Sequence, residues 1–293
     1  MRLELTLSKE TVSNYFSVSI TNKNTKIRIS NNILVVSNEL IDIWQNFLES
    51  RNLKDQFNQW FYMEAVLSTD YVTKVTLNTS GDNSTENNVI INTCELSRDK
   101  IIVGESTNII PANKRGTIKF ISNSDFNREK KQRIKILDIY NVYCKNRCSD
   151  IFSLYETPVV IDVNLNSDSN ILAKYLSKFY ENSPKLIIRD LYLANTENLR
   201  NFRKYILPYV DKHMCNITIQ FHWDTATQKR QLESIFNNLD GYTINIENVS
   251  KECMHESFIE SDKYKFNIGY RLKLFGVKDD GLTQQDTITI TRK

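Results

Sequence analysis

Apolar residues in the first part of the chain alternate with polar ones in some stretches and recur every three to four residues in others. Leu3, Leu5 and Leu7 alternate with polar residues, and Ile33–Val36 is an unbroken apolar run, as in a strand buried on both faces. Strands are predicted at 3–7, 16–20, 27–29, 33–36, 72–77, 100–103 and 118–121, and helices at 38–48, 57–65 and 84–96. Ser37 is the predicted N-cap of the first helix, and Asn83 with Glu86 a predicted capping box for the last.

A second and more regular alternation of strands and helices begins at Pro158. Strands are predicted at 159–163, 186–188, 217–221, 242–246 and 287–291, the last at a sheet edge, and helices at 170–180, 196–206 and 225–239. Such alternation is typical of α/β folds with parallel strands. The sequence therefore predicts two α/β units, at 1–125 and 158–293, joined by a basic junction at 126–157.

The stretch 253–276 is predicted to be a β-hairpin that turns near Ser261 and Asp262. Period-two geometry places His255 and Ser257 on one face of its first strand. Lys263 and Lys265 share a face of the return strand, so a histidine, a hydroxyl and two ammonium groups could face one patch. A hairpin with an ordinary solvated face fits the same pattern.

Composition and charge narrow the class of protein. The chain has 293 residues, a formal net charge of +3 and 40% hydrophobic residues, which is typical of a globular protein. No stretch has the length and apolarity of a membrane span. The odd number of cysteines, five, favours reduced thiols, so we expect a cytoplasmic location and no transmembrane segment.

Positive charge concentrates between residues 128 and 147, where seven basic residues stand against two acids. Basic side chains neutralise phosphates, so this run predicts nucleic acid as a partner. A solvated charged element at a domain boundary is the alternative interpretation. The predicted contacts in the run are Arg128, Lys130, Lys131, Arg133 and Lys135.

Four acids follow predicted strands or begin predicted helices in the first unit: Asp42, Asp82, Glu86 and Glu105. Their positions and the order of elements resemble a PIN-like nuclease domain, which implies Mg²⁺ or Mn²⁺ as a cofactor for phosphodiester hydrolysis. The chain departs from that family because no aspartate ends a strand before Ile33, and Glu105 stands where aspartate is usual. Capping and surface roles for these acids are the alternative.

His255, Ser257 and Asp262 have the spacing of the phospholipase D motif His-x-Lys-x4-Asp, with serine in place of lysine. Together with Arg189, Asp190 and Tyr192 after a predicted strand, this order of elements resembles the MIT C-terminal domain of that superfamily, over residues 158–276.

The resemblance implies a pocket near Arg189, Asp190 and Tyr192. It also implies His255 as a nucleophile on phosphorus, with His222 or a second His255 in a homodimer as its partner. Lys263, Lys265 and Arg271 would supply the positive charge that Ser257 lacks.

These features lead to one main prediction of function and two alternatives. The main prediction is a phosphate-directed, nucleic-acid-binding component of a bacterial anti-phage defence system, built on a degenerate hydrolase fold and acting with other defence subunits. An active nuclease is the first alternative, through His255 in a homodimer or through a metal at the amino-terminal acids. A membrane-surface adaptor that binds phospholipid is the second.

Overall fold

A computed structural model describes residues 1–16, 23–65, 71–78, 81–237, 239–269, 271–276, 282 and 285–293. The chain divides into two compact units. The amino-terminal unit contains Arg2–Lys130 and Val142–Tyr155, and the carboxy-terminal unit contains Met1, Lys131–Asn141 and Glu156–Lys293. Residues 126–157 are thus divided between the units, with α7 (Ile136–Lys145) crossing the division. Sheets of parallel and mixed strands interleave with helices in the chain, which confirms the predicted α/β class.

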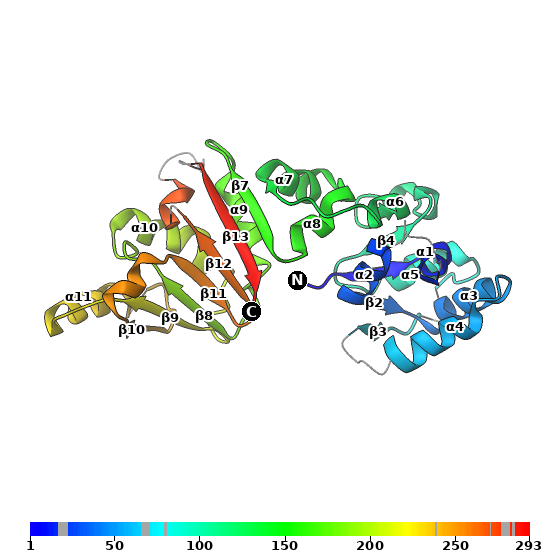
Figure 1. The fold of residues 1–293 in the computed structure, drawn as a ribbon, viewed down its shortest axis with the longest axis horizontal. Helices are drawn as coiled ribbons and strands as arrows, with labels where there is room; N and C mark the ends of the chain where they lie inside the picture. Colours follow the sequence, from blue (N-terminus) through cyan, green and yellow to red (C-terminus); the bar gives the residue numbers. More distant parts are fainter. Residues whose placement is uncertain are drawn as a thin grey trace. The chain divides into compact units, whose positions relative to one another are not determined.

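The amino-terminal unit is built on a parallel sheet with strand order β3-β2-β1-β4-β5 (Figure 1). Its strands are β1 (Glu4–Leu7), β2 (Ile33–Val36), β3 (Val72–Lys74), β4 (Ile101–Gly104) and β5 (Lys119–Ser122). The α-helices are α1 (Lys9–Phe16), α2 (Lys23–Asn31), α3 (Asn38–Glu49), α4 (Lys54–Asn58), α5 (Glu86–Glu95), α6 (Asn123–Phe126) and α8 (Ile151–Tyr155). A π-helix η2 (Gln59–Ala65) and the 3₁₀ turns η3 (Thr107–Ile109), η4 (Ala112–Lys114) and η5 (Cys148–Asp150) complete it.

Helix α3 forms where the sequence predicts it, and it supplies the centre of this core. The Ser37 side chain accepts a hydrogen bond from the Leu40 N–H, which confirms the predicted N-cap. Trp44 is fully buried, and its indole N–H donates to the Leu7 carbonyl of β1 at 3.1 Å. The rings of Phe57 and Phe61 meet Trp44 edge-on at 6.1 and 6.3 Å.

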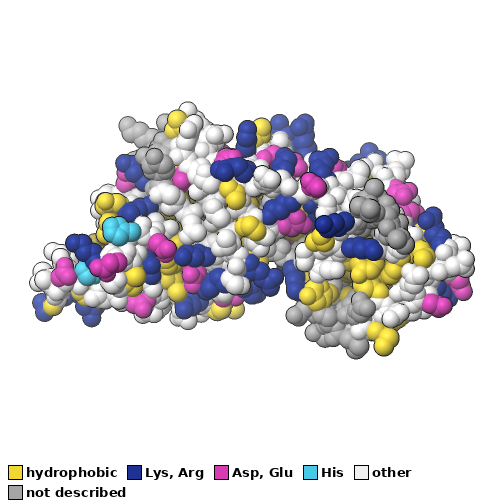
Figure 2. Space-filling model, in the orientation of Figure 1, with side chains coloured by type: hydrophobic (Ala, Val, Ile, Leu, Met, Phe, Trp, Pro, Cys, Tyr) yellow, Lys and Arg dark blue, Asp and Glu magenta, His cyan; other side chains and the backbone are white. Residues whose placement is uncertain are grey.

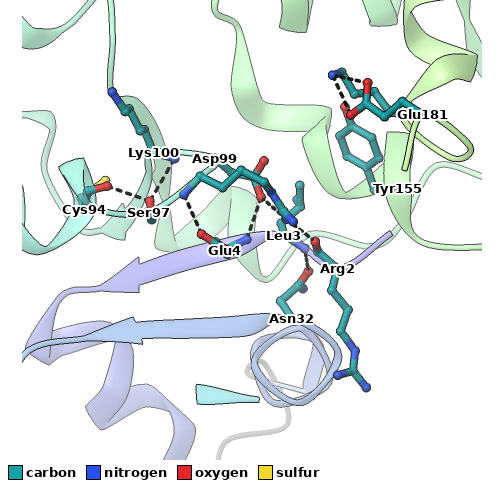
Figure 3. A network of polar contacts seen from close by, with 12 residues as sticks. Arg2, Leu3, Glu4, Asn32, Cys94, Ser97, Asp99, Lys100, Tyr155 and Glu181 are labelled. Atoms are coloured by element: carbon teal, nitrogen blue, oxygen red, sulfur yellow. Dashed lines mark hydrogen bonds and ion pairs between the residues drawn. The ribbon is translucent and has the colours of Figure 1, made fainter. Parts of the chain in front are cut away.

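Side chains around the start of β1 fix that strand against its neighbours (Figure 3). The Leu3 N–H donates to Asn32 Oδ1, and the Glu4 N–H donates to Asp99 Oδ2, each at 2.9 Å. The Arg98 N–H donates in return to Glu4 Oε2 at 2.6 Å. Backbone groups that a parallel sheet leaves unpaired at a strand end are thereby satisfied by side chains.

Two predictions in this unit are wrong, and one falls partly outside the described residues. Residues 27–29 lie in α2 and not in a strand, and this helix buries Thr25, Arg28 and Ile29 but leaves Ile27 44% exposed. Helix α5 is capped by Thr85, whose hydroxyl accepts from the Asn88 N–H, and not by Asn83. Of the strand predicted at 16–20, Phe16 ends α1, and the rest lies outside the described residues.

The carboxy-terminal unit is built on a mixed sheet of eight strands, in the order β10-β9-β8-β11-β12-β13-β7-β6 (Figure 1). The strands are β6 (Ile134–Lys135), β7 (Val159–Val163), β8 (Lys185–Arg189), β9 (Asn216–Phe221), β10 (Ile244–Asn248), β11 (Phe258–Ser261), β12 (Tyr264–Ile268) and β13 (Asp286–Arg292). The helical segments are α9 (Ser169–Ser177), α10 (Thr196–Asn201), η6 (Phe202–Ile206), η7 (Leu207–Tyr209), α11 (Ala226–Phe236), η8 (Lys251–His255) and η9 (Arg271–Phe275). β13 pairs with both β12 and β7, so its predicted edge position is wrong.

The two faces of this sheet differ in character. On one face Phe266 of β12 packs against Phe179 and Tyr180, and Phe221 of β9 packs against Phe236 of α11. The opposite side chains form what we call the polar face. Cross-strand register places on it Lys135, Val160, Asp162, Lys185, Ile187, Arg189, Asn216, Thr218, Gln220, Asn245, Glu247, Phe258, Glu260, Lys265, Asn267, Thr287, Thr289 and Thr291.

Candidate nucleic-acid interface

A row of paired residues crosses the polar face near the carboxyl ends of β8, β9 and β10. Each member lies directly opposite the next on the neighbouring strand, so the side chains are in contact range across the sheet. From β10 to β13 the row contains Glu247, Gln220, Arg189, Phe258, Asn267 and Thr289.

Arg189 occupies the middle of this row and is held on several sides. Its Nε and Nη2 donate to Gln220 Oε1 at 2.9 and 2.7 Å, and Nη1 donates to the Cys253 carbonyl at 3.3 Å. Its Cζ lies 4.7 Å from the centre of the Phe258 ring. The side chain keeps 15% of its surface exposed, so a fixed guanidinium is presented at the polar face.

Lys265 contacts the same two side chains as Arg189, the Phe258 ring and the Glu256 carboxylate. Its Nζ lies 4.4 Å from the Phe258 centroid and 3.4 Å from Glu256 Oε2. Arg189 Nη1 lies 3.8 Å from that oxygen. Two cations therefore converge on one aromatic ring and share one acid, and the acid itself is exposed and screened by water. A phosphate oxygen could take the place of the Glu256 carboxylate between them.

The residue after Arg189 belongs to a different environment. Asp190 is 2% exposed, and its Oδ1 accepts from the Tyr192 N–H at 2.8 Å. Arg271 Nη1 is 3.9 Å from the same oxygen, and Arg271 Cζ lies 4.4 Å from the Tyr192 ring centre. The predicted pocket residues thus separate, with Arg189 on the polar face and Asp190, Tyr192 and Arg271 together at the end of β8.

Burial raises the pKa of the Asp190 carboxyl, and the opposing effects of the Tyr192 N–H, the Arg271 charge and the Leu272 N–H are smaller. A carboxyl with a raised folded-state pKa binds its proton more tightly when folded. Its contribution to stability is therefore lost as pH rises above the unfolded value of about 3.9 and through the folded one. We expect Asp190→Asn to gain stability relative to the native chain as pH rises from about 4 to about 7. Urea unfolding across that range measures this, and a difference that stays constant or shrinks would contradict it.

The predicted catalytic residues of the hairpin do not come together within the chain. The turn after Ser261 is confirmed, but the first strand begins only at Phe258, and His255 ends the 3₁₀ helix η8. This helix buries Met254, which the predicted alternation had placed in a strand. His255 precedes β11 and Asp262 follows it, so about 13 Å of extended strand separates them. The strand predicted at His255 is therefore wrong, and the catalytic roles of His255, Ser257 and Asp262 stay predictions.

His222 is engaged by its own surroundings. Its Nδ1 lies 2.9 Å from the Val249 carbonyl, and its Nε2 lies 3.1 Å from Asp224 Oδ1. The pKa of Glu252 is lowered first by its own N–H and the Ser250 hydroxyl, and further by the charges of His222 and His255. The two histidines thus lie near a carboxylate, the Glu252 side chain. A site for a phosphate needs concentrated positive charge, and a carboxylate at this position opposes it.

Two of the four acids predicted to hold a metal, Asp82 and Glu86, make other contacts. Asp82 accepts from the Ser84 N–H and hydroxyl, which lower its pKa, and Glu86 forms an ion pair with Lys9 at 2.6 Å. Within the described ranges, no three His, Cys, Asp or Glu side chains are arranged to hold a metal ion. Asp42, Asp82, Glu86 and Glu105 are therefore not gathered into such a group, and Mg²⁺ or Mn²⁺ as a cofactor stays a prediction.

Three cations of the basic run are paired with acids, and two of those acids lie outside the run. Arg133 makes a two-pronged contact with Asp162, from Nη2 to Oδ1 at 2.6 Å and from Nε to Oδ2 at 3.0 Å, and its Nη2 also donates to the Thr287 hydroxyl. Lys131 pairs with Asp138 at 3.0 Å. In the amino-terminal unit, Arg128 Nη2 forms an ion pair with Asp125 Oδ1 at 2.5 Å. The run is also divided between the units, so the predicted interface over Arg128, Lys130, Lys131, Arg133 and Lys135 is not a single uncompensated patch.

No family model matches this chain, and no curated protein matches it in sequence. The PIN-like and phospholipase D-like assignments therefore stay predictions. In the part of the chain that the structure describes, no helix combines the length and apolarity needed to cross a membrane. Sequence reasoning singled out Lys263 and Lys265 but missed Phe258 and Gln220, because their importance comes from strands that pair across long sequence distances.

Proposed function

We propose that the carboxy-terminal unit binds single-stranded nucleic acid on its polar face. The observation that carries this proposal is the convergence of Arg189 and Lys265 on the Phe258 ring, near the middle of the eight-stranded sheet. Guanidinium planes stack on bases, and both cations attract phosphates, so one site can meet both parts of a nucleotide.

The strands beside this site offer polar groups suited to a backbone. Thr287, Thr289 and Thr291 of β13 place their hydroxyls on the polar face, next to Asn267 and Lys265 of β12. Hydroxyl and amide groups donate to phosphate and sugar oxygens without reading sequence. A single strand that follows β12 and β13 would therefore meet a row of donors leading from the Arg189–Lys265 pair.

Charges of both signs are interspersed over the surface of this unit (Figure 2). Glu260 on the polar face is paired with Lys293 at 2.7 Å, and Asp162 is paired with Arg133. Because Lys293 and Arg133 are occupied by these acids, the attraction for a polyanion comes from a few other cations, chiefly Arg189 and Lys265. We therefore expect salt-sensitive binding of moderate strength, with a small number of phosphate contacts.

A nuclease is the weaker candidate, because His255 ends η8 before β11 while Asp262 follows β11, and the charges of His222 and His255 act on the Glu252 carboxylate. The anti-phage role, its partner subunits and the phospholipid alternative stay predictions. An anionic phospholipid vesicle belongs in the binding test below, since it presents phosphate without bases.

Charge reversal of the two converging cations tests the proposal. We expect the double variant Arg189→Glu and Lys265→Glu to bind a labelled oligonucleotide at least about tenfold more weakly near 0.1 M salt. Loss of two phosphate contacts should also reduce the salt slope by about 1.4 for a single strand. Fluorescence anisotropy over a salt series measures both quantities.

The matched control carries the same change of charge on α11 of the same unit. Lys229→Glu with Arg230→Glu alters two cations on that helix, whose Phe236 packs on the opposite face of the sheet. Equal weakening by the two double variants would reject the polar face as the binding surface. Binding of anionic vesicles in place of oligonucleotides would assign it to lipid.

A further inference from the structure

Buried polar atoms without a hydrogen-bond partner gather at the carboxyl end of β8. Seven such side-chain atoms occur in the described residues, and four of them belong to one group of neighbours. We call this group the Asp190 cluster. Its unpartnered atoms are Asp190 Oδ2, Asn198 Oδ1, Asn201 Oδ1 and Arg271 Nη1.

Hydrogen bonds through the other atoms of these side chains hold the cluster together. Asn198 Nδ2 donates to the Tyr192 carbonyl at 3.1 Å, and the Tyr192 N–H donates to Asp190. Asn201 Nδ2 donates to the Leu272 carbonyl at 2.9 Å, next to Arg271. Asp190, Asn198 and Asn201 are each at most 5% exposed. The side-chain amide nitrogens of Asn198 and Asn201 thus donate within the cluster, whereas their amide oxygens have no hydrogen-bond partner.

The donor or acceptor character of the four unpartnered atoms defines which ligand groups could hydrogen-bond to them. Three are acceptors and one is a donor, so the complement must bring several N–H or O–H groups. A phosphate brings acceptors and does not fit. Buried polar atoms in native proteins are nearly always paired, and a concentration of exceptions indicates a role.

The neighbouring aromatic surface favours a nucleobase as the source of these donors. The Tyr192 side chain is 50% exposed, and Arg271 lies against its ring. Arg271 also has a φ of 62°, a left-handed conformation that costs energy for a side chain of this kind. Arg271 Nη1 makes no hydrogen bond and lies 3.9 Å from Asp190 Oδ1, so a shift of this strained arginine that admits a stacked base on Tyr192 would lengthen an ion pair but break no hydrogen bond through Nη1.

We infer that the Asp190 cluster takes the amino edge of a nucleobase, and so favours cytosine, adenine or guanine over thymine or uracil. This inference rests on the proposed binding of a single strand. Arg189 and Asp190 are consecutive residues, so a strand held at Arg189 brings an adjacent base to the cluster. Thymine and uracil present two carbonyl oxygens around one N–H, and these would face the acceptors of Asp190 and the asparagines.

Oligo(dC) and oligo(dT) of equal length test the inference by anisotropy against the native protein. We expect oligo(dC) to bind about tenfold more tightly. Asp190→Asn keeps the size of the side chain but replaces an acceptor with an amide donor, and it should bring the two affinities within about twofold. Tyr192→Leu, at an exposed position, should weaken oligo(dC) by about tenfold through lost stacking.

The outcomes separate this inference from the proposed function. Equal native affinities, or a preference that survives Asp190→Asn, would overturn the base-reading role and mean that the cluster holds ordered water only. The Arg189→Glu and Lys265→Glu double variant should weaken both oligonucleotides equally while keeping their ratio. Failure of the native protein to bind either oligonucleotide would overturn the proposed function and the inference together.

Discussion

Replacing Trp44 with alanine is expected to cost the amino-terminal unit about 3 to 5 kcal/mol of unfolding free energy. The indole is fully buried between β1 and the rings of Phe57 and Phe61. Its truncation leaves a cavity and also an unsatisfied Leu7 carbonyl, since the indole N–H donates to that oxygen. A loss of this size is comparable to the whole stability of many domains, so local or global unfolding of this unit follows.

Urea unfolding measures the loss of stability, and hydrogen exchange on peptides from each unit shows whether the loss is confined to the amino-terminal unit. Met63→Ala is the matched control, because it truncates a large apolar side chain that is 67% exposed in the same unit. The control should change stability by less than about 0.5 kcal/mol. Equal effects of the two variants would contradict the central position assigned to Trp44.

Phe266→Ala is expected to destabilise the carboxy-terminal unit by a similar amount, about 3 to 5 kcal/mol. Phe266 is 1% exposed and meets Phe179 and Tyr180 at 5.9 and 6.0 Å between ring centres. It lies between Lys265 and Asn267 in β12, on the opposite face of the strand. The same change should therefore loosen the polar face and weaken oligonucleotide binding, although no binding residue is altered.

Denaturant unfolding and oligonucleotide affinity are both measured for this variant, and Met214→Ala is its control. Met214 is 69% exposed in the same unit, so its truncation should leave both quantities nearly unchanged. Native affinity in a Phe266→Ala protein that has lost stability would show that the polar face does not depend on the packing behind it.

Elements set by local sequence were predicted well. The apolar run Ile33–Val36 forms β2, and Ser37 caps α3, because both depend on residues within one turn or one strand. Thr225 likewise begins α11 with a capping box, which its own sequence neighbours complete. Strand–helix alternation was enough to predict the α/β class.

Features set by distant pairing were not predicted. The position of β13 depends on β12 and β7, and the neighbours of Arg189 come from β9 and β11. The hairpin prediction failed at His255 because a short 3₁₀ helix that buries one methionine has no distinct sequence period. The basic run did not predict an uncompensated patch correctly, because acids that pair with its cations, such as Asp162 with Arg133, lie on other elements.

The internal position of β13 also sets an order of events during folding. β12 and β7 are joined in the sheet only through β13, which follows both of them in the chain. Until β13 has been synthesised, each of these strands presents an unpaired edge with free N–H and C=O groups. The β7–β6 pair therefore cannot join the rest of the sheet until β13 is in place, and until then the unpaired strand edges are open to mispairing.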